Sequence, residues 1–318
     1  MNGPFTAKIF TGTANPKLAK DVTDYLHITL GAQDLKKFSD GEIRVEIEET
    51  VRGDDVYLIQ PTCSPTNDNL MELLIMADTA RRSACDSITA IIPYYGYARQ
   101  DRRPDYTRTP ITSRLVADMI ETAGIDKVVT IDLHSGQQQG FFHIPVTNIS
   151  ASPEIVGDIW RNHKMDEIIV VSPDTGGVAR ARHIAKQLND ADLAIVDKRR
   201  PKANVAQVMN VIGQVEGKTC ILIDDMIDTA GTLAKGAAAL KERGATKVVA
   251  YATHGVFSGE ALDNMVNSDI DEIVVTDTIP LSQVFKDEPK IRTISIAPLL
   301  AETIRRMQSK QSISELYA

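Results

Sequence analysis

The chain has 318 residues, with 35 Lys and Arg against 43 Asp and Glu, so its formal net charge is −8. Hydrophobic residues make up 43% of the chain and charged residues 25%. This is the composition of an ordinary globular protein, and it excludes disordered, collagen-like and disulfide-scaffold classes. The acidic balance argues against nucleic acid or an anionic membrane as the main partner, and the length predicts two domains.

The cysteines and the N-terminus indicate the compartment. Cys63, Cys85 and Cys220 have neither a metal-binding nor a redox spacing, which favours a reducing environment. The first residues lack the pattern of an export signal, and nowhere do about 18 apolar residues run together. We therefore expect a cytoplasmic protein without a membrane partner.

Short apolar runs alternate with helical patterns along the chain. Eight runs predict strands, at 8–10, 56–59, 88–92, 128–131, 168–171, 220–223, 248–252 and 273–275. Strands this uniformly apolar are usually buried on both faces of a parallel sheet. Four amphipathic helical patterns lie between them, at 18–26, 115–123, 178–188 and 233–240. Gly124 and Gly244 are placed to end two of these helices. The alternation predicts an α/β fold.

The order of these units repeats after about half of the chain. The strand at 56–59 corresponds to that at 220–223, and the strand at 88–92 to that at 248–252. The helices that follow the strands at 8–10 and 168–171 correspond as well. We therefore expect two similar domains, each with a mostly parallel central sheet flanked by helices.

The expected seam between the two domains lies near residue 150. The N-terminal domain is predicted over 1–150 and the C-terminal domain over 151–299, with the tail from about 300 to 318 packing back on the first. Ser152 is expected to cap the helix that follows the seam, with Pro153 in its first turn.

The most informative segment is IDDMIDTAGT at 223–232. We expect it to leave a buried strand at Ile223, to turn through acidic residues and to enter a helix. Helix N-termini at the carboxyl ends of parallel strands bind phosphate, so residues 228–232 would wrap a phosphate. Asp224 and Asp225 suit the hydroxyls of a sugar or a ligand bridged by Mg²⁺. The alternative is that one of these acids only caps the helix.

Two other segments resemble phosphate loops. SPDTGG at 172–177 lies between a strand and a helix, and its glycines allow backbone N–H groups to approach an anion. Taken alone, it is equally well a plain turn between strand and helix. GQVEGKT at 213–219 is one residue too short for the phosphate loop of nucleoside triphosphatases and precedes a strand, so we exclude it.

Five motifs occur in a fixed order: KFSDGE (37–42), YARQDRR (97–103), DLHSGQQQGFF (132–142), SPDTGG and IDDMIDTAGT. With them the chain resembles the ribose-phosphate pyrophosphokinases of the phosphate-activated type over nearly its full length. The resemblance implies two phosphoribosyltransferase-like domains. It also implies transfer of the diphosphoryl group of MgATP to the 1-hydroxyl of ribose 5-phosphate, giving phosphoribosyl diphosphate and AMP. A hexamer built from dimers, activation by inorganic phosphate and inhibition by ADP are implied as well.

The resemblance assigns site residues motif by motif. The ribose 5-phosphate site takes Asp224, Asp225, Asp228, Thr229, Ala230, Gly231 and Thr232, and the pyrophosphate loop takes Asp174, Thr175, Gly176 and Gly177. The ATP site takes Phe38, Asp40, Glu42, Arg99, Gln100 and Asp101. His134 and Asp174 stand at Mg²⁺-linked positions, and Lys198 and Arg200 at catalytic positions of a mobile loop. The regulatory site takes Thr50, Arg52, Arg108, Ser312 and Ser314.

Three of these assignments have plainer alternatives. His134 is otherwise a core histidine, and the basic run at 198–200 a solvated charge cluster. Phe38 is otherwise an aromatic residue at a strand end before an Asp-Gly hairpin turn. The catalytic assignment has a physical reason. Charge develops on the phosphoryl oxygens as AMP leaves, and Mg²⁺ with Lys198 and Arg200 would stabilise that charge.

The sequence also departs from the family pattern. His143 and Thr147 stand where many members carry acids, and PDYTRT at 104–109 replaces a basic loop of the regulatory site. Two other functions fit parts of the pattern. A transferase that consumes phosphoribosyl diphosphate would leave the first half of the chain without a role. A silent regulatory subunit is disfavoured because Lys198, Arg200, His134 and Asp224 are all present.

Overall fold

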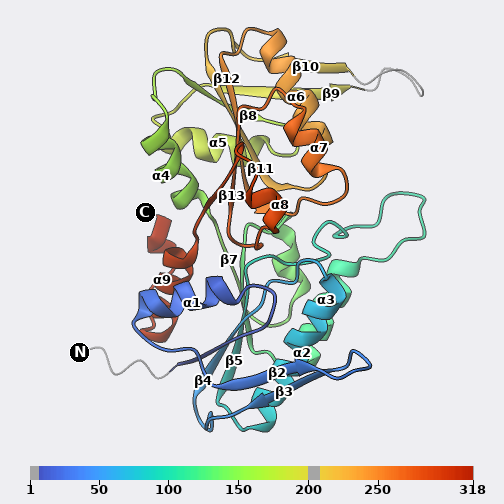
Figure 1. The fold of residues 1–318 in the computed structure, drawn as a ribbon, viewed down its shortest axis with the longest axis vertical. Coiled ribbons are helices and arrows are strands. Elements are labelled where there is room, and N and C mark those ends of the chain that lie inside the picture. Colours follow the sequence, from blue (N-terminus) through green and yellow to red (C-terminus); the bar gives the residue numbers. More distant parts are fainter. Residues whose placement is uncertain (1–6, 200–207, 318) are drawn as a thin grey trace. The chain divides into compact units, whose positions relative to one another are not determined.

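The computed structural model describes residues 7–199 and 208–317, which divide into two compact units. The first unit runs to Ser150 and also includes Thr278–Pro280 and the chain from Ser295 onward. The second unit consists of Ala151–Asp277 and Leu281–Ile294. Each unit has its own central sheet and its own helices (Figure 1).

The sheet of the first unit has five parallel strands in the order β1-β4-β5-β6-β7. These are β1 (Lys8–Thr11), β4 (Asp55–Ile59), β5 (Ser87–Ile92), β6 (Lys127–Ile131) and β7 (Val146–Ile149). A separate antiparallel hairpin is formed by β2 (Gln33–Lys37) and β3 (Ile43–Ile47). The hairpin turn predicted at Asp40-Gly41 is therefore confirmed.

The sheet of the second unit has seven strands in the order β10-β9-β8-β11-β12-β13-β14. These are β8 (Ile168–Ser172), β9 (Leu193–Arg199), β10 (Val208–Ile212), β11 (Thr219–Ile227), β12 (Lys247–Gly255), β13 (Glu272–Thr276) and β14 (Ile291–Ile294). All neighbouring pairs are parallel except β9 with β10. The predicted α/β fold with two similar, mostly parallel sheets is confirmed.

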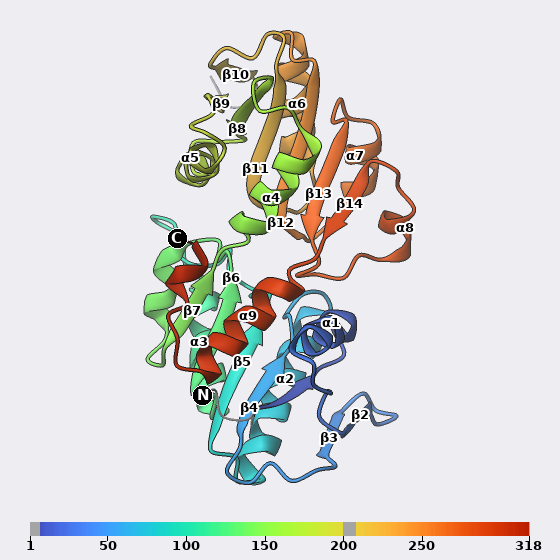
Figure 2. The same cartoon turned by 90° about the vertical axis from the view of Figure 1, so that its left-hand side faces the viewer.

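Helices cover both faces of the first sheet. One face packs against α2 (Thr66–Arg82) and α3 (Thr112–Thr122), whose apolar side chains form a core cluster with alternate residues of β4, β5 and β6. On the other side of the unit, α1 (Pro16–Leu26) and α9 (Ala297–Gln308) pack against each other (Figure 2). Gln308 at the end of α9 donates a hydrogen bond to Tyr57 Oη of β4 at 3.0 Å. A short helix, η1 (Gly136–Phe141), follows β6, and η2 (Ser314–Tyr317) closes the described chain.

The second sheet is covered in the same manner. One face packs against α6 (Gly231–Glu242) and α7 (Ala261–Val266), which form a core cluster with alternate residues of β11, β12 and β13. The other face carries α4 (Ser152–Asn162) and α5 (Val178–Gln187), and a short helix α8 (Gln283–Lys286) precedes β14. The expected glycine ends are confirmed, because Gly124 after α3 and Gly244 after α6 have positive φ.

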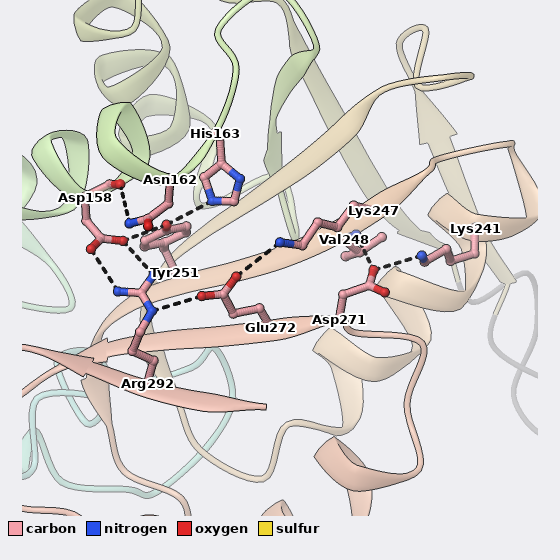
Figure 3. Close-up of polar contacts among 10 residues, drawn as sticks. All are labelled: Asp158, Asn162, His163, Lys241, Lys247, Val248, Tyr251, Asp271, Glu272 and Arg292. Atoms are coloured by element: carbon pink, nitrogen blue, oxygen red, sulfur yellow. Dashed lines mark hydrogen bonds and ion pairs between the residues drawn. The ribbon is translucent and has the colours of Figure 1, made fainter. Parts of the chain in front are cut away.

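A polar network ties α4 to the sheet near the amino-terminal ends of β12, β13 and β14 (Figure 3). Asp158 of α4 accepts two hydrogen bonds from the Arg292 guanidinium, at 2.8 and 2.7 Å, and one from Tyr251 Oη at 2.9 Å. Glu272 accepts one from Arg292 at 2.9 Å and one from Lys247 at 3.2 Å. Burial raises the pKa of Asp158, but these donors outweigh it and lower that pKa overall. The network therefore holds a buried carboxylate ionised.

Two local predictions were wrong. Strand β11 does not end at Ile223 but continues to Ile227, so Asp224 and Asp225 lie within the strand and not in a turn. Pairing with β12 as far as Gly255 holds this extension in place. Ser152 was predicted to cap the next helix, but it is the first residue of α4. The cap position is taken by Ala151, which has no side-chain hydrogen bond to the helix. No helix within the described residues is long and apolar enough to span a membrane.

Candidate active site

The two phosphate-loop candidates of the second unit follow neighbouring strands. β8 and β11 pair in parallel, with Val171 opposite Leu222. The loop at 173–177 follows β8, and the loop at 228–230 follows β11. Because carboxyl ends of parallel strands lie at one edge of a sheet, the structure brings the two candidate loops to the same edge of this unit.

The loop after β8 is exposed and shaped by its own hydrogen bonds. Asp174 Oδ1 accepts a hydrogen bond from the Gly177 N–H at 2.8 Å, and Ser172 Oγ donates to the Asp174 carbonyl at 2.6 Å. Asp174, Thr175 and Gly176 are exposed, whereas Gly177 is buried. A Cβ on Gly177 would lie 2.9 Å from Ser172 Oγ, which explains why glycine stands at this first position before α5.

The loop after β11 leads into a 12-residue helix. Ala230, in the left-handed conformation, precedes α6, whose first residues are Gly231 and Thr232. The cap position is taken by Ala230, which has no side chain that could accept a hydrogen bond, so the alternative that Asp224 or Asp225 serves only as the cap is wrong. Uncapped N–H groups at a helix N-terminus attract phosphate.

Two residues that sequence reasoning missed support this loop. Ser258 donates its hydroxyl to the Asp228 carboxylate and its backbone N–H to the Asp228 carbonyl, the latter at 3.2 Å. Asn264 of α7 donates its amide to the Thr229 carbonyl at 2.8 Å. Both follow β12 and lie about thirty residues or more from the loop in sequence. No local pattern connects them to it, so only the fold identifies them.

The acid pair Asp224 and Asp225 contacts one arginine. Arg180 Nη1 of α5 lies 3.1 Å from Asp225 Oδ1 and 3.6 Å from Asp224 Oδ1. The Asp225 side chain is only 6% exposed, whereas that of Asp224 is 31% exposed. Burial and the neighbouring Asp225 raise the pKa of Asp224 to about 8, although Arg180 opposes this shift. Because this environment disfavours the ionised form of Asp224, a ligand that donates hydrogen bonds to its carboxylate would stabilise that form.

The residues assigned to ATP lie in two segments of the first unit. Phe38, Asp40 and Glu42 are exposed in the β2–β3 turn, and the Phe38 side chain is 52% exposed. Arg99 and Gln100 are exposed in the loop after β5, and Asp101 beside them is half-buried. Phe38 and Glu42 close the turn through a backbone hydrogen bond of 2.8 Å.

Both ATP segments contact the first turn of α2. Lys37, next to Phe38, pairs with Asp68 at 2.5 Å. Tyr97, two residues before Arg99, donates its hydroxyl to Asn67. The two segments, which are sixty residues apart in sequence, are thus anchored on adjacent residues of one helix.

His134 and the five residues assigned to the regulatory site lie in the first unit. His134 is exposed in the turn after β6, so the alternative of a core histidine is wrong. Thr50, Arg52, Arg108, Ser312 and Ser314 are exposed, and the hydroxyls of the two serines lie 2.8 Å apart. The side chain of Lys198, at the end of β9, and the whole of Arg200 lie outside the described residues.

The chain is similar to known proteins over almost its whole length. A family model described as the N-terminal domain of ribose phosphate pyrophosphokinase matches residues 7–124, and one described as a phosphoribosyl synthetase-associated domain matches residues 167–318. A ribose-phosphate pyrophosphokinase of Chromobacterium violaceum is 61% identical over 97% of this chain and 94% of its own. One of Xanthomonas axonopodis pv. citri is 57% identical over 97% of both chains.

A solved structure has the same fold. The crystal structure of phosphoribosylpyrophosphate synthetase from Mycobacterium smegmatis matches with a TM-score of 0.90 at 43% identity, over 96% of this chain and all of the other. Similarity of this identity and coverage in sequence and in structure establishes the family. The chain therefore belongs to the ribose-phosphate pyrophosphokinases and is an enzyme.

Proposed function

We propose that this protein transfers the diphosphoryl group of ATP to the 1-hydroxyl of ribose 5-phosphate, giving 5-phosphoribosyl 1-diphosphate and AMP. The hydroxyl oxygen attacks the β-phosphorus, the bond from that phosphorus to the oxygen bridging it to AMP breaks, and the hydroxyl proton is released. One observation carries the proposal: two loops suited to phosphates and an acid pair suited to sugar hydroxyls share one edge of the second sheet. Membership of the family supports it.

We assign the substrates to the residues described above. The N–H groups at Asp228–Thr232 would hold the 5-phosphate at the start of α6, and Asp224 would accept hydrogen bonds from the ribose hydroxyls. The loop Asp174–Gly177 would hold the diphosphate that is transferred. For ATP, Phe38 would stack on adenine while Asp40, Glu42, Arg99, Gln100 and Asp101 bind the nucleotide.

The residues at the proposed Mg²⁺ positions fit a cation that is held mainly by substrate. Among the described residues, no group of three or more His, Cys, Asp or Glu side chains is arranged to hold a metal ion. Mg²⁺ usually takes only one or two protein ligands and binds chiefly through waters and substrate phosphates. Asp174 and His134 are exposed and would supply such ligands. Mg²⁺ bound in this way neutralises charge on the triphosphate.

Catalysis itself is assigned to Lys198 and Arg200, aimed at the charge that develops on the phosphoryl oxygens. Because that charge is largest in the transition state, Lys198→Ala should lower kcat at least ~100-fold with little change in the KM for ribose 5-phosphate. Steady-state kinetics measure this, with the exposed Lys186→Ala as the control. A loss confined to KM would refute the assignment.

Regulation, assembly and location complete the proposal. Thr50, Arg52, Arg108, Ser312 and Ser314 would form the site for activating phosphate and inhibiting ADP, in a cytoplasmic homohexamer. Purified protein mixed with ATP, Mg²⁺ and ribose 5-phosphate should form AMP and phosphoribosyl diphosphate in equal amounts, faster when inorganic phosphate is added. No AMP under any condition would indicate a silent subunit. Consumption of phosphoribosyl diphosphate with a base would indicate a transferase.

A further inference from the structure

Arg180 occupies a position that its own helix does not favour. It is the third residue of α5, in the first turn, where the helix dipole disfavours positive charge. Its Nη1 nevertheless lies 3.1 Å from Asp225 Oδ1 and 3.6 Å from Asp224 Oδ1. A residue that its own helix does not favour commonly stands there because a tertiary contact or the function requires it. Here the contact is with the acid pair Asp224 and Asp225.

The two acids of the pair differ in their access to a ligand. Asp225 is almost fully buried, and its hydrogen bond from Arg180 supplies the charge partner that a buried carboxylate needs. Turning Asp225 toward a ligand would separate this pair. Asp224 keeps about a third of its side chain exposed, so it is the acid that a sugar can reach.

The two acids are also mechanically connected. The backbone N–H of Asp225 donates a hydrogen bond to Asp224 Oδ1 at 2.9 Å. The orientation of the Asp224 carboxylate therefore depends on the strand segment at Asp225, and the side chain of Asp225 is held by Arg180.

We propose that Arg180 is a positioning residue of the ribose 5-phosphate site: by pairing with buried Asp225, it fixes the strand segment that presents Asp224 to the sugar hydroxyls. This inference rests on the proposed function. Arg180 acts through Asp225 and does not itself touch the substrate. Lysine replaces it only in part, because an ammonium lacks the planar fork of a guanidinium.

Kinetics of three variants test the role. Arg180→Met removes the charge but keeps most of the length, Arg180→Lys keeps the charge, and Arg182→Met serves as the matched control. Arg182 lies on the same helix, is exposed and forms no ion pair with the residues that the structure describes. Arg180→Met should raise the KM for ribose 5-phosphate at least ~10-fold, as expected for a lost charge-assisted hydrogen bond, with a smaller change in kcat and an unchanged KM for ATP. Arg180→Lys should fall between it and the wild type.

A double variant shows whether Arg180 acts through Asp225. Ribose 5-phosphate affinity is measured by calorimetry for Arg180→Met, Asp225→Asn and the two combined. If Arg180 acts through Asp225, the combined loss is clearly smaller than the product of the single losses. Independent effects, or an unchanged KM in Arg180→Met, would overturn the proposal.

Folding and function are controlled separately. Thermal unfolding of each variant is recorded, and if Arg180→Met does not fold, Arg180→Lys decides: its affinity for ribose 5-phosphate must drop at an unchanged midpoint. A wild type that makes no AMP but binds ribose 5-phosphate would refute the proposed reaction alone. The calorimetric comparison would still judge Arg180.

Discussion

The two units contain the same five-stranded arrangement, but they differ at the edge formed by the carboxyl ends of the strands, where the second unit carries the candidate site. Leu58 of β4 pairs with Phe10 and Ala90, and Leu222 of β11 pairs with Val171 and Ala250. The strand order β1-β4-β5-β6-β7 thus corresponds to β8-β11-β12-β13-β14. The repeat predicted from the sequence is confirmed at the level of topology and register.

Counting onward from these pairs shows where the units diverge. Gln60 stands in the first unit where Asp224 stands in the second, and Thr13 stands where Asp174 stands. Gln60 is fully buried, whereas the Asp224 side chain is 31% exposed. Thr13 and Asp174 are both exposed. The position of Gln60 and Asp224 is therefore buried in the first unit and reaches solvent at the candidate site of the second.

Glu72 of α2 connects the ends of β1 and β4 in the first unit by hydrogen bonds to Thr13 and Gln60. Its buried carboxylate accepts hydrogen bonds from the Thr13 N–H at 2.6 Å, from the Thr13 hydroxyl and from the Gln60 amide at 2.7 Å. These are the kinds of donors that a loop offers to a bound anion. Six residues after its first residue, α2 carries Glu72, whereas α6 carries Ala237 at that position. A buried acidic side chain thus bonds to the ends of two strands in the first unit, where the second unit has an alanine.

The largest expected effect is on activity, at the candidate site of the second unit. Asp224→Ala removes the only exposed acid of the pair, so it should lower kcat/KM for ribose 5-phosphate about 1,000-fold, by weakening sugar binding and turnover together. Calorimetry with ribose 5-phosphate and steady-state kinetics measure the two parts. Gln60→Met, at the corresponding position, should leave both unchanged. Unchanged affinity in Asp224→Ala would mean that the sugar binds elsewhere.

The next largest effect is on stability, at Glu72 in the first unit. Glu72→Ala leaves the buried Gln60 amide and the partly buried Thr13 N–H without this acceptor, so the free energy of unfolding should fall by about 3 kcal/mol. Urea denaturation measures this, and the KM for ribose 5-phosphate should stay within twofold. Asp78→Ala on the same helix breaks only an exposed pair with Arg82 and should cost at most about 0.5 kcal/mol. Equal losses in the two variants would show that Glu72 contributes no more than an exposed ion pair.

A smaller effect is expected at the β2–β3 turn. The β2–β3 hairpin does not pair with the sheet of the first unit, whereas the β9–β10 hairpin extends the sheet of the second unit. Phe38→Ala should raise the KM for ATP about 10-fold without lowering the thermal midpoint, because the exposed ring adds stacking but little packing. Tyr25→Ala, which truncates an equally exposed ring on α1, is the control. A midpoint that fell by several degrees would assign Phe38 a structural role instead.

The smallest effect is the pH dependence of stability. The pKa of Asp224 is raised to about 8 in the folded chain, mainly by burial, so the folded state keeps a proton that the unfolded state loses above about pH 4. Stability therefore falls as pH rises from 4 to 8, and the penalty is complete above 8. Asp224→Asn should melt at least ~2 °C above the wild type at pH 9, with a smaller difference at pH 5. A constant difference at both pH values would contradict the shift.

Much of the fold could be predicted because its signals are local. Uniformly apolar runs predicted the buried parallel strands, and Gly124 and Gly244 predicted two helix ends. The segment 223–232 was placed correctly between a strand and a helix, but its strand end was not. Acidic residues resemble a turn in sequence, and only pairing with β12 shows that the strand continues through them.

The sequence by itself therefore determined the class of fold, the repeat and the segments of the candidate site, because strand periodicity, turn residues and loop motifs act over a few neighbouring residues. The tertiary structure alone decided that Glu72 bonds to Thr13 in one unit and that Arg180 pairs with Asp225 in the other. Each of these contacts joins residues that are far apart in the chain. Burial of charge is a property of such contacts, so it cannot be read from any short stretch.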